Sequence, residues 1–232
     1  MSLGISGKEF EKRRVLQPDD VEISPTAFNA VIGGITVWGL LLNYMMVVFL
    51  SEPILRMLDG LNPAVAVLLY IGLVIVGSLM IRSESPLTSI IGYHLIAVPV
   101  GVIVCVALQG RGVETVRTAI ALTGAVTCLF TVLGFAFPNF FRSTGRVLGI
   151  GLVASIGVEL IASFILRRYF GFLDWVLVAL FSMYIGYDWA RANSCARTLN
   201  NAVDLAANLY IDIINLFLRL LRILEIFDSR SR

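Results

Sequence analysis

Three acidic side chains lie within or beside long apolar runs of the 232-residue chain: Glu159, Asp188 and Asp212. An ionised aspartate at the centre of a membrane helix costs about 2.5–3.5 kcal/mol on insertion scales. Such residues are tolerated where they face the interior of a bundle, pair with another group, or carry a proton. Carboxylates in such places can bind and release protons. Each of the three is therefore a candidate functional residue.

The spacing of Asp188 and Asp212 suggests that they share one site. They are 24 residues apart and a turn-rich stretch separates them. If the first helix continues past Asp188 and the chain reverses near Asn200, each aspartate is twelve residues from the turn, or about 18 Å along its helix. An antiparallel hairpin would then bring the carboxylates together. Two carboxylates in a low-dielectric site do not ionise together easily, so we expect two proton-release steps, as a switch near neutral pH requires.

Seven polar residues follow one side of the last apolar segment, which extends over about 203–227. At about 100° per residue they fall within a sector of roughly 80°. They are Asn201, Asp204, Asn208, Asp212, Asn215, Arg219 and Arg222. This pattern fits an interfacial helix with a solvated face or a helix whose polar face lines a bundle interior. The mid-segment place of Asp212 favours the interior, with Asn208, Asn215 and Glu159 as further candidates for a cation path.

The composition indicates what kind of scaffold must position these residues. Apolar residues (AVILMFWYC) make up 58% of the chain and charged residues 15%. An average soluble protein has roughly 45–50% apolar residues with glycine included and about 25% charged residues. The apolar runs are long and do not alternate, which is typical of membrane helices. We therefore expect an all-α, multi-pass membrane protein, with the lipid bilayer as its surroundings.

Seven apolar segments are expected to be helical, and each of the first five reaches the roughly 20 residues needed to cross the hydrocarbon. The segments extend over about 28–50, 62–81, 87–108, 115–137, 146–166, 174–187 and 203–227. Residues 51–61 and 138–145 are expected to be loops. The chain thus divides into a polar arm (1–26), a seven-helix bundle (27–228) and a short tail (229–232).

The distribution of basic residues predicts the orientation. Lys and Arg are enriched in the short loops on the cytoplasmic side of a membrane. A cytoplasmic N-terminus places nine of them inside and five outside. The nine are Lys8, Lys12, Arg13, Arg14, Arg82, Arg142, Arg146, Arg191 and Arg197. Four further arginines at the C-terminus would equalise the two sides if the last segment crosses fully, so that crossing is open. No apolar stretch precedes Ala27, so we expect no cleavable signal peptide, and we expect a prokaryotic plasma membrane.

Other functional classes find little support in the residues. No basic stripe with interleaved aromatics indicates a nucleic-acid interface. Cys105, Cys128 and Cys195 lack a paired metal-ligand spacing and are expected to be small buried residues. The single histidine, His94, is expected to be packed and hydrogen-bonded. Because no Ser–His–Asp, thiol or zinc constellation is recognisable, we expect neither an enzyme nor a cofactor.

Two stretches near the C-terminus resemble the signature of the transmembrane Bax-inhibitor-motif family. They are Gly186-Tyr-Asp188 and Asn208-Leu-Tyr-Ile-Asp212-Ile-Ile-Asn215-Leu-Phe-Leu-Arg-Leu-Leu-Arg222-Ile-Leu. The resemblance implies a seven-helix membrane bundle with the polar-faced last helix at its centre. It also implies a pH-sensitive calcium leak and, in eukaryotic members, an association with suppression of cell death.

The resemblance assigns roles to four residues. The family's proposed pH sensor, an aspartate pair in helices six and seven, matches Asp188 and Asp212 at the same spacing. An arginine at the cytoplasmic end of helix two, proposed to bond the pair and gate the path, matches Arg82. An arginine late in helix seven, which supports the pair, matches Arg222.

Two positions depart from the family pattern. A helix-two glutamate of a prokaryotic relative has no counterpart, because Ile71 falls about where it should be. Glu159 has no place in the pattern, and it either serves as a cation ligand or pairs with an arginine.

The leading functional hypothesis is a passive Ca²⁺ path gated by Asp188 and Asp212, with both carboxylates as Ca²⁺ ligands. Ca²⁺ is then the transported ion, and protons set the gate. In the closed state Arg82 should lie within hydrogen-bond distance of Asp188 or Asp212, with Glu84 as its alternative partner. Two other functions remain open: a calcium/proton antiporter that uses the same carboxylates, and a non-transport membrane scaffold or cell-survival factor.

Overall fold

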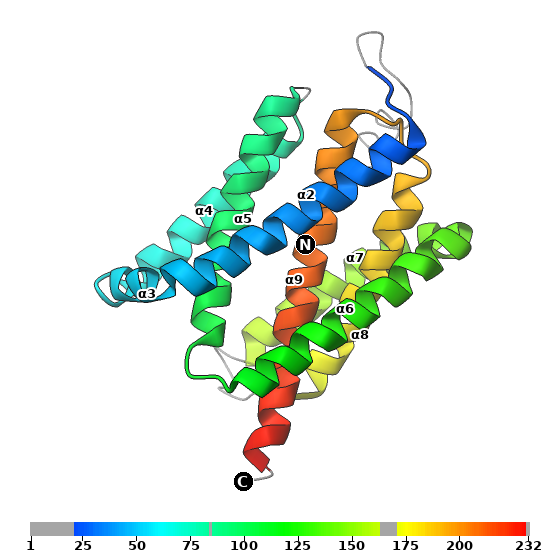
Figure 1. The fold of residues 1–232 in the computed structure, drawn as a ribbon. Coiled ribbons are helices and arrows are strands. Elements are labelled where there is room, and N and C mark those ends of the chain that lie inside the picture. Colours follow the sequence, from blue (N-terminus) through cyan, green and yellow to red (C-terminus); the bar gives the residue numbers. More distant parts are fainter. Residues whose placement is uncertain (1–20, 84, 163–170, 231–232) are drawn as a thin grey trace. The chain divides into compact units, whose positions relative to one another are not determined.

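The computed structural model describes residues 21–83, 85–162 and 171–230, and all the regular structure in these ranges is helical. The expectation of an all-α protein is therefore confirmed. The helices are shown in Figure 1 and include a π-helical turn, η1, between α2 and α3. Their bounds are α2 Pro25–Met45, η1 Met46–Leu50, α3 Ser51–Asp59, α4 Pro63–Ile81, α5 Pro86–Leu108, α6 Val113–Ala136, α7 Pro138–Leu160, α8 Gly171–Ala192 and α9 Leu199–Arg230.

Prolines mark where several of these helices begin. Proline suits the first helical turn, because its missing N–H needs no partner there and its φ is already helical. Four helices start in this way, at Pro25, Pro63, Pro86 and Pro138. The first two also have N-caps, since the Ser24 and Asn62 side chains accept hydrogen bonds from the backbone at 3.2 and 2.9 Å.

Two predicted loops are helical in the structure. Residues 51–59 form α3, in which Pro53 occupies the first turn, and residues 138–145 are the first two turns of α7. Both loop predictions were wrong because a proline in a first turn begins a helix instead of breaking it. The predicted arm, residues 1–26, lies outside the described residues up to position 20, and α2 already begins at Pro25.

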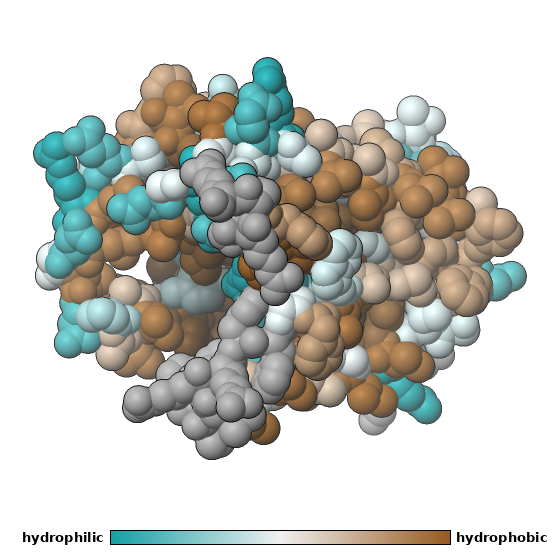
Figure 2. Space-filling view, turned by 90° about the horizontal axis from the view of Figure 1, so that it is seen from below, coloured by the Kyte–Doolittle hydropathy of each residue, from teal (hydrophilic) through white to brown (hydrophobic). Residues whose placement is uncertain are grey.

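Among the residues that the structure describes, five helical stretches are long and apolar enough to cross a membrane. They are Pro25–Asp59, Pro63–Ile81, Pro86–Leu108, Val113–Ala136 and Pro138–Leu160. Large apolar side chains on their outer faces are exposed, among them Leu68, Val132 and Val153. Hydrophobic residues cover most of the face seen in Figure 2. A surface of this kind requires lipid around it, so the chain is a multi-pass membrane protein.

The described helices form two compact units. The N-terminal unit contains α2, η1, α3, α4, α5 and the chain from Cys195 to Tyr210, which includes the start of α9. The C-terminal unit contains α6, α7, α8 and the part of α9 from Ile211 onward.

Close helix packing organises the N-terminal unit. α4 and α5 lie side by side (Figure 1), and a Cβ placed on Gly77 or on Gly92 would come within 2.7 Å of the other residue's carbonyl oxygen. Small residues allow such contact between membrane helices. The Asn43 amide on α2 and the Tyr210 hydroxyl on α9 are hydrogen-bonded at 2.6 Å. This bond joins the start of α9 to the unit.

In the C-terminal unit, α8 packs against both α6 and α7. A Cβ on Gly134 of α6 would lie 2.6 Å from the carbonyl oxygen of Gly186 on α8. The other side of Gly186 contacts the Phe141 ring of α7. Gly186 therefore sets how closely α6 and α7 approach α8, two residues before Asp188.

Candidate functional site

The structure brings Asp188 and Asp212 together within the C-terminal unit. Asp188 on α8 is 3% exposed and Asp212 on α9 is 1% exposed. Their carboxyl groups lie close enough to interact directly. A hydrogen bond between two carboxyl groups requires a proton on one of them. Two carboxyl groups placed in this way can share one proton.

The two aspartates meet in a different register from the one expected. α8 ends at Ala192 and α9 begins at Leu199, so the chain reverses before Asn200. Asp188 is four residues before the end of α8, whereas Asp212 is thirteen residues after the start of α9. The offset of nine residues is about 13 Å of helix. Residues 193–198 can cover it, because six non-helical residues span up to about 20 Å.

A buried arginine accompanies the pair. The Nη1 atom of Arg191 is 3.8 Å from Oδ1 of Asp188, and Arg191 is 4% exposed. Tyr184 is also buried and lies one helical turn before Asp188. A pair that shares one proton has a charge of −1, which Arg191 balances.

Arg191 was missed at the sequence level because it was counted as a loop residue in the orientation argument, whereas it lies inside α8. Its position three residues after Asp188, on the same face of one helix, was the available signal.

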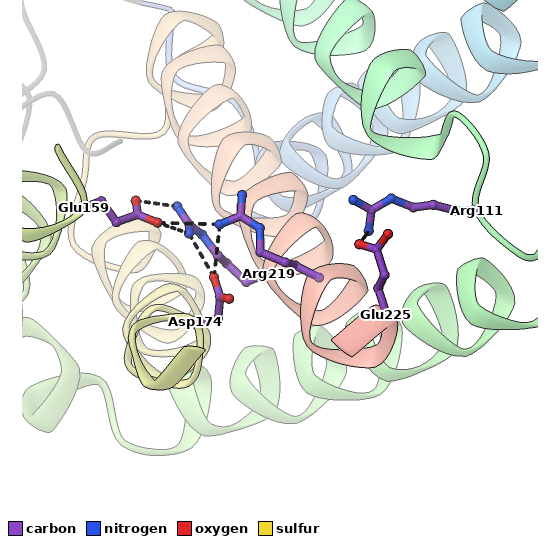
Figure 3. Close-up of polar contacts among 6 residues, drawn as sticks. Arg111, Glu159, Asp174, Arg219 and Glu225 are labelled. Atoms are coloured by element: carbon purple, nitrogen blue, oxygen red, sulfur yellow. Dashed lines mark hydrogen bonds and ion pairs between the residues drawn. The ribbon is translucent and has the colours of Figure 1, made fainter. Parts of the chain in front are cut away.

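A second cluster of charges is formed by Glu159 of α7, Asp174 of α8, and Arg219 and Arg222 of α9. Glu159, Asp174 and Arg219 are labelled in Figure 3. Arg219 donates to both oxygens of Glu159, with Nη2 at 2.9 Å from Oε2, and its Nη1 is 3.0 Å from Oδ1 of Asp174. Arg222 Nη1 is 3.4 Å from the same oxygen of Asp174 and 3.7 Å from Glu159. The cluster contains two carboxylates and two guanidinium groups, so its formal charges cancel.

Two residues predicted as site residues, Glu159 and Arg222, lie in this cluster. Glu159 pairs with arginine, as one of the two alternatives predicted, and its role as a cation ligand stays a prediction. Arg222 lies in this cluster, ten residues or about 15 Å along α9 from Asp212. Asp174, which is 1% exposed, was missed because it stood at the expected edge of an apolar segment. A separate ion pair, Arg111–Glu225 at 2.6 Å, is also drawn in Figure 3.

The polar side of α9 is packed against protein. Among residues 201–224 none is exposed, which favours a helix whose polar face lies in an interior over an interfacial helix with a solvated face. α9 is also one continuous helix of 32 residues, about 48 Å long. The Asn208 and Asn215 amides donate to the backbone carbonyls of Asp204 and Ile211, at 2.9 and 2.8 Å.

The contact of Arg82 with the aspartate pair and the binding of Ca²⁺ by Asp188 and Asp212 stay predictions. Arg82 follows α4 in the N-terminal unit, where it is half-buried. Glu84, its proposed alternative partner, lies outside the described residues. Within the described ranges, no group of three or more His, Cys, Asp or Glu side chains has the arrangement of a metal site. Asp188 and Asp212 thus offer Ca²⁺ two carboxylates.

The remaining reactive side chains have structural partners. His94 Nε2 accepts a hydrogen bond from Trp38 Nε1 at 3.0 Å, and its Nδ1 is 2.8 Å from the Ile90 carbonyl oxygen. This confirms the predicted packed, hydrogen-bonded imidazole. Cys105 is buried as expected. Cys128 is exposed, so its predicted burial was wrong: an apolar run in a membrane helix also supplies the lipid-facing side.

The fold and the apolar surface define an all-α, multi-pass membrane protein with ionisable groups buried between its helices. The model of the family described as Inhibitor of apoptosis-promoting Bax1 matches residues 25–229. The chain therefore belongs to this family, and the resemblance of its C-terminal segments is confirmed.

Two similar proteins come from two strains of Helicobacter pylori, and each is described as an uncharacterized protein. They are 30% identical to this chain over 126 and 125 residues. The matched part is 52% of this chain and 52% of each relative, so the chain spans about half the length of the curated relatives it matches.

Proposed function

We propose that this protein is a passive Ca²⁺ leak path whose opening is controlled by protons on the Asp188–Asp212 pair. The observation that carries the proposal is the close approach of two carboxyl groups that are almost completely buried, beside the buried Arg191. Two acids so placed are costly in a membrane protein. A stable fold would more cheaply use apolar residues there, so the pair is best explained by a task that requires protons or cations.

The pair supports gating through its charge. With one shared proton, its charge of −1 is balanced by Arg191 and the hydrogen bond holds α8 to α9. Loss of that proton places two negative charges side by side, and only a cation or an arginine can offset their repulsion. Gain of a second proton removes the charge that holds Arg191. Either change alters the contact between α8 and α9, so the leak depends on pH.

The coordination chemistry supports Ca²⁺ passing through the pair without being stored there. Ca²⁺ takes six to eight oxygen ligands, and the pair supplies two carboxylates. Water must supply most of the remaining ligands. A site that binds weakly enough to release the ion is what conduction requires. Asn208 and Asn215, about one turn from Asp212 on either side, extend the polar face of α9 along the proposed path.

Further parts of the proposal concern the membrane arrangement. The absence of any exposed residue among 201–224 supports a place for α9 at the centre of a seven-helix bundle. Arg82 would bond the aspartate pair in the closed state. We place the protein in a prokaryotic plasma membrane with its N-terminus in the cytoplasm.

The test is calcium flux into liposomes that contain the purified protein, measured across a pH series. Wild-type protein should conduct with a clear pH dependence, and Asp188→Asn and Asp212→Asn should each make the flux independent of pH. Asp59→Asn, at the exposed end of α3, is the matched control and should behave as the wild type. An unchanged pH response in both buried variants would overturn the proposal.

Two other outcomes would replace this function with another. An imposed calcium gradient that drives protons in fixed stoichiometry would identify a calcium/proton antiporter. Wild-type flux no greater than that of protein-free vesicles would leave a non-transport scaffold or cell-survival factor.

A further inference from the structure

Four charged side chains from three helices meet in one cluster, and the proposed gate uses none of them. Glu159, Asp174, Arg219 and Arg222 belong to α7, α8 and α9 of the C-terminal unit. Arg219 forms a fork with both oxygens of Glu159 while it also holds Asp174. Fork pairing is directional, because two parallel hydrogen bonds fix the plane of the guanidinium group. The cluster therefore specifies how α9 lies against α7 and α8.

The cluster and the aspartate pair lie on the same helix faces. Arg219 follows Asp212 by seven residues, which on one α-helix is about 10 Å along the axis and within about 20° around it. Asp174 precedes Asp188 by fourteen residues, within about 40° around α8. One face of α8 and one face of α9 thus carry both clusters. A shift of α9 that separates Asp212 from Asp188 must also move Arg219.

Other interactions between membrane helices do not easily replace the ionic contacts of this cluster. Lipid tails are as apolar as the helix surfaces, so apolar contacts alone give helices little preference for one register. The side chains of Arg219 and Asp174 are 16% and 1% exposed, and removal of either charge leaves its partner poorly compensated. The formal charges of the complete cluster cancel, so the intact cluster does not need an added ion.

We infer that Glu159, Asp174, Arg219 and Arg222 form an ionic lock that fixes the register of α9 and sets how readily the Asp188–Asp212 pair opens. The inference rests on the proposed function, because it assigns the lock to the gate of that leak. While the lock is closed, α9 can pivot about Arg219 but cannot slide along α8. Breaking the lock removes this restriction, and the aspartate pair separates more often at any pH.

The first test measures calcium leak at the pH where the wild-type leak is smallest. Glu159→Gln and Arg219→Gln should each raise it about tenfold, the equivalent of about 1.4 kcal/mol. The double variant Glu159→Gln/Arg219→Gln restores the charge balance, because Asp174 and Arg222 remain. It should therefore leak less than the product of the two single effects predicts. Arg219→Lys keeps the charge without the fork and should give an intermediate leak.

A matched control is available in the same unit. Glu114 and Arg117 form an exposed ion pair on α6, with side chains 81% and 77% exposed. Exposed pairs contribute little, so Arg117→Gln should leave the leak unchanged. If a single lock variant does not fold, Arg219→Lys still decides the question, because it keeps the cluster's charge balanced and should leak more than the wild type.

A second measurement does not depend on flux. Spin labels at the exposed positions 153 on α7 and 227 on α9, in a chain whose three cysteines are replaced by alanine, report the distance between these helices. The lock predicts one narrow distance distribution in the wild type and in Arg117→Gln, and a broader one in Glu159→Gln and Arg219→Gln.

The two readouts separate failure of the lock from failure of the proposed leak. If wild-type vesicles carry no calcium flux, the proposed function fails and the role of the lock at the gate fails with it. The label distances then show whether the cluster still holds the register of α9. If the wild type conducts but the variants match it in flux, the inference is overturned. This holds even if the label distances broaden, because the cluster then stabilises the helix positions without affecting the gate.

Discussion

The aspartate pair and the ionic lock occupy the same faces of α8 and α9 but differ in how their charges are balanced. The pair sets two acids against each other beside Arg191, and it can share a proton. The lock has two acids and two arginines, so its balance needs no proton. The pair is also more deeply buried than Glu159 and Arg222 of the lock, whose side chains are 28% and 42% exposed. The comparison teaches that two acids in direct contact make a buried cluster sensitive to protons, while acids that are each paired with arginine make it rigid.

The largest effect is expected from Arg191→Gln, which removes the cation of the deeper cluster. Breaking a buried ion pair costs about 3–5 kcal/mol, because the remaining charge loses its partner. Unfolding in detergent or nanodiscs should show a loss of this size. Arg197→Gln is the control, since Arg197 pairs with Glu22 at an exposed site and should change stability by less than about 1 kcal/mol. Equal losses in the two variants would show that Arg191 does not balance the aspartate pair.

A smaller effect is expected from Gly186→Ala, which changes how α8 packs without touching a charge. The added methyl group would overlap the Phe141 ring, and such overpacking costs about 1–3 kcal/mol. Gly186 is two residues from Asp188, so the variant should alter the pH dependence of the calcium flux. The distance between spin labels at positions 153 and 227 should change little.

Gly149→Ala, on α7, is the control for this packing effect. A methyl group there meets nothing within 4 Å, and alanine favours a helix over glycine by about 0.5–1 kcal/mol. Destabilisation by Gly149→Ala of the same size as by Gly186→Ala would contradict the packing argument.

Salt should separate the two clusters. The Debye length falls from about 10 Å at 0.1 M to about 3 Å at 1 M, and exposed charges are screened more than buried ones. Double-mutant cycles on stability should therefore show the coupling of Glu159 to Arg219 falling by about half in 1 M salt. The coupling of Asp188 to Arg191 should change little. Equal salt dependence would mean that the two sites do not differ in burial as their exposed fractions indicate.

The smallest effect is expected from Trp38→Phe in the N-terminal unit. This change removes the indole N–H that donates to His94, and a typical hydrogen bond contributes about 0.5–1.5 kcal/mol. Thermal unfolding should show a loss in that range while the pH dependence of the leak stays that of the wild type. A flattened pH response would give His94 a part in gating that neither the aspartate pair nor the ionic lock requires.

The composition and the apolar runs were sufficient to predict the membrane class, the all-α fold and the place of most helices. They did not indicate where helices begin, since Pro53 and Pro138 were interpreted as loop residues. A proline's meaning depends on whether it falls in the first turn or the interior, and local sequence does not distinguish these cases well. Local sequence also does not show which glycines lie at tight helix contacts. Gly77 and Gly186 lie at tight helix contacts, whereas Gly33 and Gly157 face open space, although all four stand in apolar runs.

By itself, the sequence determined that Asp188 and Asp212 are expensive residues in the membrane and that α9 has one polar side. Burial cost and helical periodicity are properties of the chain alone. Only the tertiary structure decided which groups meet. It placed Arg191 beside Asp188 and Arg222 beside Asp174, and it gave Glu159 an arginine partner. A helix presents its charges to whichever neighbour packs against it, and the register between two helices is set by shape and connection length, which no single segment encodes.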